Sequence, residues 1–218
     1  MNNSNINNNI NLYCFRFFYT ASGIGKTSLL CKILANNKDV FIQPPTSIHI
    51  FFSENQPAYS DIQEKADIPV FLYQEEPTTH HSFESNSVVI FDDFQQNSNA
   101  LKVINTFFTK IAHHHNLYVF FICQNLYDPQ NKIVRSINLN STILILFNNI
   151  RDRGVISTLN KQLGFKSGYL KEIISDVVKT SSRNYLLIDL HPDTEEKLRL
   201  RSSVFLEFPS CVIYTPTQ

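Results

Sequence analysis

The sequence lacks three features that would mark particular classes of protein. Nineteen Lys and Arg balance nineteen Asp and Glu, so the chain has no net positive charge that would indicate nucleic-acid binding. Any contact with DNA must come from a local basic patch or from surfaces that several subunits form together. No uninterrupted apolar run reaches the length of about eighteen residues that predicts a membrane-spanning helix. The start also has no basic and then apolar leader. We therefore expect a soluble intracellular protein without a membrane partner.

Cysteine is also scarce. The four cysteines are far apart, and three of them lie within apolar runs. This spacing argues against a disulfide framework or a zinc site and favours reduced thiols that pack in the core. The residues concerned are Cys14, Cys31, Cys123 and Cys211.

The chain of 218 residues is 43% apolar, which is enough for one sizeable core. Short apolar and β-branched runs alternate with longer amphipathic stretches, and this alternation predicts an α/β fold with a mostly parallel central sheet flanked by helices. We expect an Asn-rich disordered tail at 1–11, the main domain at 12–190 and a C-terminal extension at 191–218. Strands are expected at 13–19, 47–52, 70–73, 87–91, 117–123, 143–147 and 185–188, and helices at about 26–35, 61–65, 101–112, 155–163 and 169–178.

A glycine-containing segment lies between the first expected strand and the first expected helix. Residues 20–27 read Thr-Ala-Ser-Gly-Ile-Gly-Lys-Thr. In such a loop, backbone N–H groups and the helix N-terminus surround phosphate oxygens, the lysine reaches the β- and γ-phosphates, and the final hydroxyl binds Mg²⁺. The segment therefore predicts a site for ATP with Mg²⁺. The expected nucleotide-binding residues are Ser22, Gly23, Ile24, Gly25, Lys26, Thr27 and Ser28, of which Thr27 also binds the metal and Lys26 also assists catalysis.

Two features of this region depart from the usual pattern. Thr20 stands where the phosphate loop normally begins with glycine, whose backbone is freer. Arg16 lies inside the first expected strand, although a strand buried on both faces is usually apolar throughout. The alternative interpretation of the loop is an ordinary helix N-terminus with a capping Ser or Thr.

Polar side chains follow two later strands. Asp92 and Asp93 come directly after the apolar run at 87–91, and Gln124 follows the strand at 117–123. Ligands of open α/β sheets bind at the carboxyl ends of the strands, so these side chains are expected beside the phosphate loop. We assign the Mg²⁺ hydration shell to Asp92 and activation of the attacking water to Asp93. The Gln124 amide can bond to both the γ-phosphate and the water, and so sense the terminal phosphate.

These residues resemble the FtsK/HerA branch of P-loop ATPases, and within it the genome-packaging ATPases of polinton-type elements, adintoviruses, virophages and poxviruses. The resemblance rests on a series of ordered segments across nearly the whole chain after the Asn-rich start. The segments are 21–27, 45–59, 90–93, 114–126, 135–140, 147–153 and 185–190.

The resemblance implies a RecA-like domain that assembles as a homo-oligomeric ring on double-stranded DNA. Such motors use ATP and Mg²⁺ to move DNA into a capsid, with capsid portal or vertex proteins as partners, in the host nucleus, at a viral assembly site or within the virion. The strand-end glutamine of the family corresponds to Gln124. An arginine from the neighbouring subunit completes the family's site, and by segment it is Arg135 or Arg151.

Two other functions remain compatible with the sequence. The first is a different P-loop phosphotransferase, such as a nucleotide kinase, although the chain lacks the arginine-rich lid that such an enzyme would need. The second is a decayed nucleotide-binding relic with little turnover, for which Thr20, Arg16 and the Asn-rich start are the indications.

Overall fold

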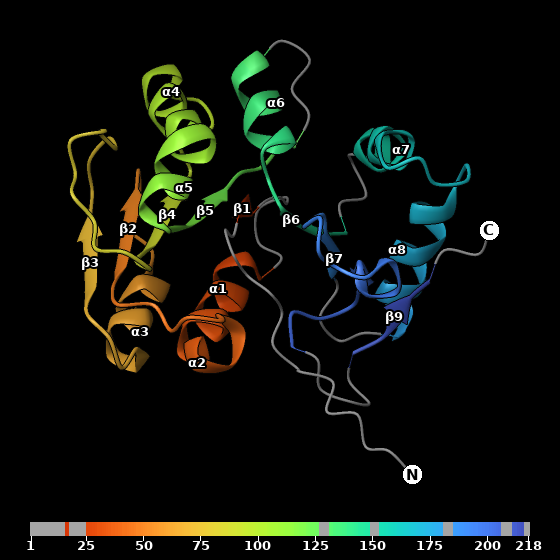
Figure 1. The fold of residues 1–218 in the computed structure, drawn as a ribbon, viewed down its shortest axis with the longest axis horizontal. Coiled ribbons are helices and arrows are strands. Elements are labelled where there is room, and N and C mark those ends of the chain that lie inside the picture. The colour runs from red at the N-terminus through yellow and green to blue at the C-terminus, as the bar shows by residue number, and fades with distance from the viewer. Residues whose placement is uncertain are drawn as a thin grey trace.

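The computed structural model describes residues 16–17, 25–126, 131–148, 153–180, 185–205 and 211–215. Five strands form a parallel sheet in the order β1-β5-β4-β2-β3 (Figure 1). Its strands are β1 (Arg16–Phe17), β2 (Ile48–Phe52), β3 (Val70–Tyr73), β4 (Val88–Asp92) and β5 (Tyr118–Ile122). The predicted α/β class with a mostly parallel sheet flanked by helices is thereby confirmed.

Helices cover both faces of this sheet (Figure 1). One face carries α1 (Lys26–Ala35), α2 (Asn37–Val40) and α3 (Pro57–Lys65). The other carries α6 (Lys132–Leu139) and one long helical stretch, composed of α4 (Ser98–Thr106), the π-helical turn η1 (Phe107–Ile111) and α5 (Ala112–His115). The sequence had not indicated α6, which is capped by the preceding Asn131, whose side chain accepts hydrogen bonds from two backbone N–H groups.

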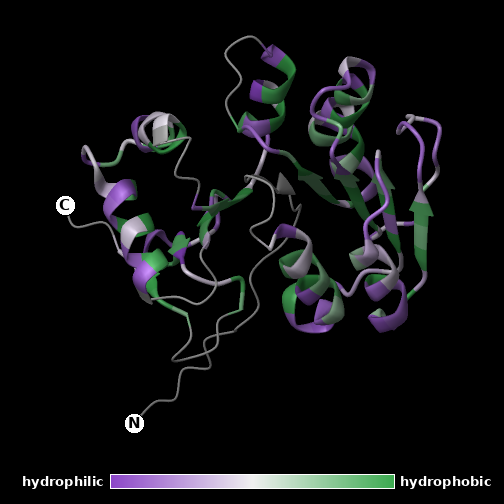
Figure 2. Ribbon diagram, turned by 180° about the vertical axis from the view of Figure 1, so that it is seen from behind, coloured by the Kyte–Doolittle hydropathy of each residue, from purple (hydrophilic) through white to green (hydrophobic). Residues whose placement is uncertain are grey.

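The central strands β2, β4 and β5 are buried at every position and are mostly apolar, because both faces of the sheet are covered there. Successive side chains of a strand point to opposite faces, so Val89 and Phe91 pack in the cluster under α4, while Val88 and Ile90 pack in the cluster under α1. Figure 2 shows hydrophobic strands between helices whose polar residues are interspersed with apolar ones.

A second, four-stranded antiparallel sheet follows in the order β6-β7-β8-β9. Its strands are β6 (Ile143–Phe147), β7 (Tyr185–Asp189), β8 (Leu200–Arg201) and β9 (Ile213–Tyr214), and the accompanying helices are α7 (Arg153–Gln162), α8 (Tyr169–Thr180) and the short 3₁₀ helix η2 (Glu196–Leu198). β6 lies beside β1, and side chains of β6 and β7 belong to the same two core clusters as the parallel sheet. Within the described part of the chain, no helix has the length and apolar character needed to cross a membrane.

A buried ion pair connects the strands of the antiparallel sheet. Arg201 Nη2 on β8 donates to Asp189 Oδ2 on β7 at 2.9 Å, and both residues are 2% exposed. Burial lowers the pKa of the Arg201 guanidinium, and the Asp189 carboxylate counteracts that effect. Among the described residues, none forms a hydrogen bond with Arg201 Nε, so the buried charge of the guanidinium is compensated mainly by Asp189.

Replacing Asp189 by Asn should therefore leave the buried Arg201 guanidinium without a negatively charged partner. We expect Asp189→Asn to lower the free energy of unfolding by about 3–5 kcal/mol, the typical cost of removing one partner from a buried pair. Urea denaturation checks this value. Asp193→Asn is the control, because the Asp193 side chain is 78% exposed, and it should change stability by less than about 0.5 kcal/mol. Equal stabilities for the two variants would contradict the expected dependence on the pair.

Candidate nucleotide-binding site

A pocket of about 340 Å³ lies at the carboxyl ends of the parallel strands, where α1 begins. It is lined by residues from four separate parts of the sequence, which is the arrangement expected of a ligand site in a parallel α/β sheet. The lining residues are Gly25, Lys26, Thr27, Ser28, Gln56, Asp92, Asp93, Ile122 and Gln124.

Seven of the site residues expected from the sequence meet in this pocket: Gly25, Lys26, Thr27, Ser28, Asp92, Asp93 and Gln124. Ser22, Gly23, Ile24 and Arg151 lie outside the described residues, as does Thr20. Arg135 is placed elsewhere, on the exposed side of α6, and does not line the pocket of its own chain.

Gly25 forms the junction between the loop and α1. Its φ of 92° lies in the left-handed region, which a residue without a Cβ adopts without strain. The N–H of Leu29 bonds to the Gly25 carbonyl at 2.9 Å and closes the first turn of the helix. The positive end of the ten-residue helix α1 is consequently directed at the pocket, where it favours an anion.

Asp92 is the buried acid of the pocket. Its Oδ2 atom accepts a bond from the Tyr59 hydroxyl at 2.7 Å and a weaker one from Gln56 Nε2 at 3.4 Å. Burial raises the pKa of the Asp92 carboxyl, and the Tyr59 bond and the charge of Lys26 partly offset that rise. Burial and the charge of Asp92 also raise the pKa of Tyr59, so the phenol remains protonated and acts as a donor.

Asp93 differs from its neighbour in exposure and backbone. It is exposed and has a φ of 63°, a left-handed conformation that Asp tolerates better than most residues. Ser53, which follows β2, donates to its carbonyl oxygen at 3.3 Å and to its Oδ2 atom at 3.4 Å. The chain therefore turns immediately after the buried strand, and the second carboxylate is accessible to water and ligand.

Gln124 is held through the backbone of its loop. Gln95, a buried residue after β4, accepts the backbone N–H groups of Gln124 and Asn125 at 2.7 and 3.0 Å, and donates to the Asn125 carbonyl at 3.1 Å. These three bonds fix the loop after β5 to the segment that follows Asp93. The exposed Gln124 side chain is left to face the pocket.

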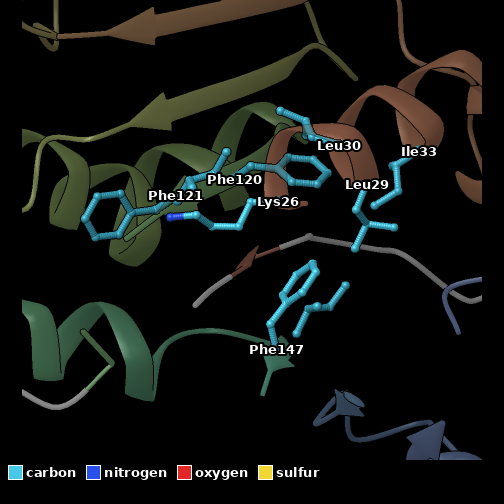
Figure 3. A pocket seen from close by; sticks show the side chains of 9 residues that line it. Lys26, Leu29, Leu30, Ile33, Phe120, Phe121 and Phe147 are labelled. Atoms are coloured by element: carbon cyan, nitrogen blue, oxygen red, sulfur yellow. The ribbon is translucent and has the colours of Figure 1, made fainter. Parts of the chain in front are cut away.

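Apolar residues of α1 and β5 lie around Lys26. Figure 3 shows the Lys26 side chain close to Phe120 and Phe121 of β5, with Leu29 and Leu30 farther along α1 in the same lining. The cavity among these side chains has a volume of only about 30 Å³. It is too small for a nucleobase and belongs to the core that anchors the start of α1.

The donor set fits Mg²⁺ bound to a nucleotide. Mg²⁺ prefers oxygen ligands and is typically held by one or two carboxylates, substrate phosphates and water. The Thr27 hydroxyl and the Asp92 carboxylate offer oxygen atoms that could hold such an ion, and the Gln56 side chain contacts both. Among the described residues, no cluster of three His, Cys, Asp or Glu side chains offers a site of another kind.

Comparisons with known proteins add little to this geometry. No protein-family model and no curated protein matches the sequence. Among solved structures, a complex of Thermomonospora curvata EccC (ATPases 2 and 3) with a signal sequence peptide is 14% identical over 63% of this chain and 30% of that one, with a TM-score of 0.42. The cytoplasmic domain of the T. curvata Type VII secretion ATPase EccC is 14% identical over 63% and 20%, with a TM-score of 0.41.

The present chain thus covers less than a third of the length of either EccC structure. Matches at this level do not bear on what the chain binds or catalyses. The functional assignment therefore depends on the pocket and on the sequence motifs within it.

The buried carboxylate should cost stability when no ligand is bound. Because burial raises the pKa of Asp92, its charged form is disfavoured in the fold, and we expect Asp92→Asn to stabilise the ligand-free chain by about 1 kcal/mol. Chemical denaturation in EDTA measures this change. Asp93→Asn is the matched control, since Asp93 is exposed and Asn also tolerates its positive φ, and it should be neutral. A destabilised Asp92→Asn variant would contradict the expectation that the buried Asp92 carboxylate costs stability.

Proposed function

We propose that the chain is a Mg²⁺-dependent ATPase that moves double-stranded DNA, as the genome-packaging motor of a virus or virus-like element. The observation that carries the enzymatic part is the pocket that unites Lys26, Thr27, Asp92, Asp93 and Gln124. The DNA-packaging part is supported by the resemblance of the ordered sequence segments to the packaging ATPases.

Each side chain of the pocket has a distinct task in this proposal. The N-terminus of α1 and the Lys26 ammonium bind the β- and γ-phosphates of ATP. Thr27 and Asp92 hold Mg²⁺, which when bound neutralises charge on the phosphate oxygens. The buried position of Asp92 and its bond from Tyr59 keep this carboxylate in one orientation.

Asp93 is suited to the role of general base because it is exposed to water in the same pocket. It accepts a proton from the attacking water as the water approaches the γ-phosphorus. Gln124 has an amide that can donate to a phosphate oxygen and accept from that water. The backbone N–H groups of Gln124 and Asn125 donate to Gln95, and these bonds fix the loop that carries the amide to the segment after Asp93.

Substitution of the lysine and of the exposed acid should separate binding from hydrolysis. We expect Lys26→Ala to abolish tight ATP binding, whereas Asp93→Asn should retain binding and lower the hydrolysis rate roughly 100-fold or more. Nucleotide binding and phosphate release, each measured with and without long double-stranded DNA, test both variants. Asp61→Asn, an exposed acid on α3, is the control and should behave as the wild type.

The same assay separates the alternatives for the whole chain. Hydrolysis stimulated by DNA supports the motor. Hydrolysis indifferent to DNA, together with phosphorylation of a small acceptor, would assign a phosphotransferase, and absent turnover would assign a relic. Unchanged turnover in Asp93→Asn would show that another group activates the water.

Assembly as a ring would allow Arg135 to reach a neighbour's nucleotide. Arg135 is exposed on α6 and absent from its own pocket, so a catalytic role requires a second copy. We expect Arg135→Ala to lower hydrolysis roughly 1,000-fold and to regain part of the activity when mixed with Lys26→Ala, because a mixed ring contains sites with both residues. Lys132→Ala, one turn earlier on the exposed side of α6, is the control.

Failure of the mixture to recover activity would remove the support for Arg135 as the trans residue. The same mixing experiment with Arg151→Ala then tests the second candidate from the resemblance.

A further inference from the structure

A chain of hydrogen bonds connects the two candidate metal ligands through a residue to which the sequence assigned no role. Thr27 Oγ1 donates to Gln56 Oε1 at 3.1 Å, and Gln56 Nε2 donates to Asp92 Oδ2 at 3.4 Å. The Tyr59 hydroxyl reaches the same Asp92 oxygen at 2.7 Å. The hydroxyl, the amide and the carboxylate come from α1, the start of α3 and the end of β4.

An amide is chemically suited to this place. A hydroxyl that binds a cation does so through an oxygen lone pair, so its proton needs another acceptor. Gln56 Oε1 is that acceptor for Thr27. The opposite end of the amide donates to a carboxylate that accepts when ionised, so the orientation of the Gln56 side chain is determined by its two partners. A side chain with only donors or only acceptors could not serve both.

The position of Gln56 is fixed by its surroundings. It is the residue immediately before α3, and Pro57 occupies the first turn, where its restricted φ suits the start of a helix. The helix is attached to α1 by a bond from Cys31 Sγ to the Ala58 carbonyl at 3.6 Å. It also carries the buried Tyr59, so two of the groups that orient Asp92 come from one short segment.

We propose that Gln56 is a positioning residue that holds the Thr27 hydroxyl and the Asp92 carboxylate in register for Mg²⁺ and thereby sets the Mg²⁺ affinity of the nucleotide complex. This inference rests on the proposed function, because it concerns the same metal and the same nucleotide. Gln56 acts on the metal through its ligands. Partners of this kind typically change metal affinity 10- to 100-fold when removed.

The test titrates MgCl₂ against the full chain and measures binding of a fluorescent N-methylanthraniloyl derivative of ADP. In wild type, Mg²⁺ should tighten nucleotide binding relative to EDTA. We expect Gln56→Ala to raise the Mg²⁺ concentration at half effect roughly 10-fold or more, while the affinity in EDTA stays within about twofold of wild type. Gln56→Met, which keeps the length of the side chain but neither bond, should give the same shift and guards against a loosened α3.

Gln63→Ala is the matched control, because this glutamine of α3 donates to the Val70 carbonyl at 3.3 Å and does not line the pocket. Its Mg²⁺ midpoint should equal that of wild type. Unshifted midpoints in both Gln56 variants would overturn the inference and leave the proposed function intact. Nucleotide binding that is weakened equally with Mg²⁺ and in EDTA would also overturn it, because Gln56 would then contact the nucleotide or support the fold instead of positioning the metal ligands. A wild-type chain that binds no nucleotide would overturn the proposed function itself.

Discussion

The register of β4 between its two neighbours determines where the acidic and amide side chains of the pocket lie. Asp92 is paired with Phe52 of β2 on one side and with Ile122 of β5 on the other. The residues that follow these three positions therefore emerge at one edge of the sheet, together with the start of α1. A slip of one residue would turn each side chain to the opposite face and would remove Asp92 from Tyr59 and Gln56. The continuous apolar packing on both faces makes such a slip costly.

Adjacent acids acquire different properties because the strand ends between them. Asp92 is the last residue of β4 and remains under α3, whereas Asp93 turns into a left-handed conformation and is exposed. Burial of the Asp92 carboxylate costs desolvation free energy but restricts its orientation. Hydrogen bonds from Tyr59 and Gln56 offset part of that cost. Solvent access makes the second carboxylate suitable for proton transfer. The strand terminus thus gives two identical side chains separate chemical roles.

Much of the pocket was predictable because its main residues lie at the ends of strands and helices that the sequence pattern itself reveals. Lys26, Asp92 and Gln124 each follow or begin a recognisable element, and parallel topology brings such termini together. Gln56, Tyr59 and Gln95 were not predicted as site residues. Their hydrogen bonds join positions 29 to 36 residues apart, and an isolated Gln or Tyr carries no periodic signal. The polar segment after the strand at 47–52 was the available hint for Gln56.

The antiparallel sheet shows a different limit of sequence reasoning. β6 and β7 are buried at every position, and such strands read the same whether they pair in parallel or not. Their antiparallel direction is shown by the pairing itself, in which Ile143 lies opposite Asp189 and Phe147 lies opposite Tyr185. Arg201 is the least predictable member of this sheet, because a charged residue near the end of a sequence usually faces solvent. Only the position of Asp189 across the strand pair explains its burial, and that proximity depends on the antiparallel register rather than on either residue's neighbours in the chain.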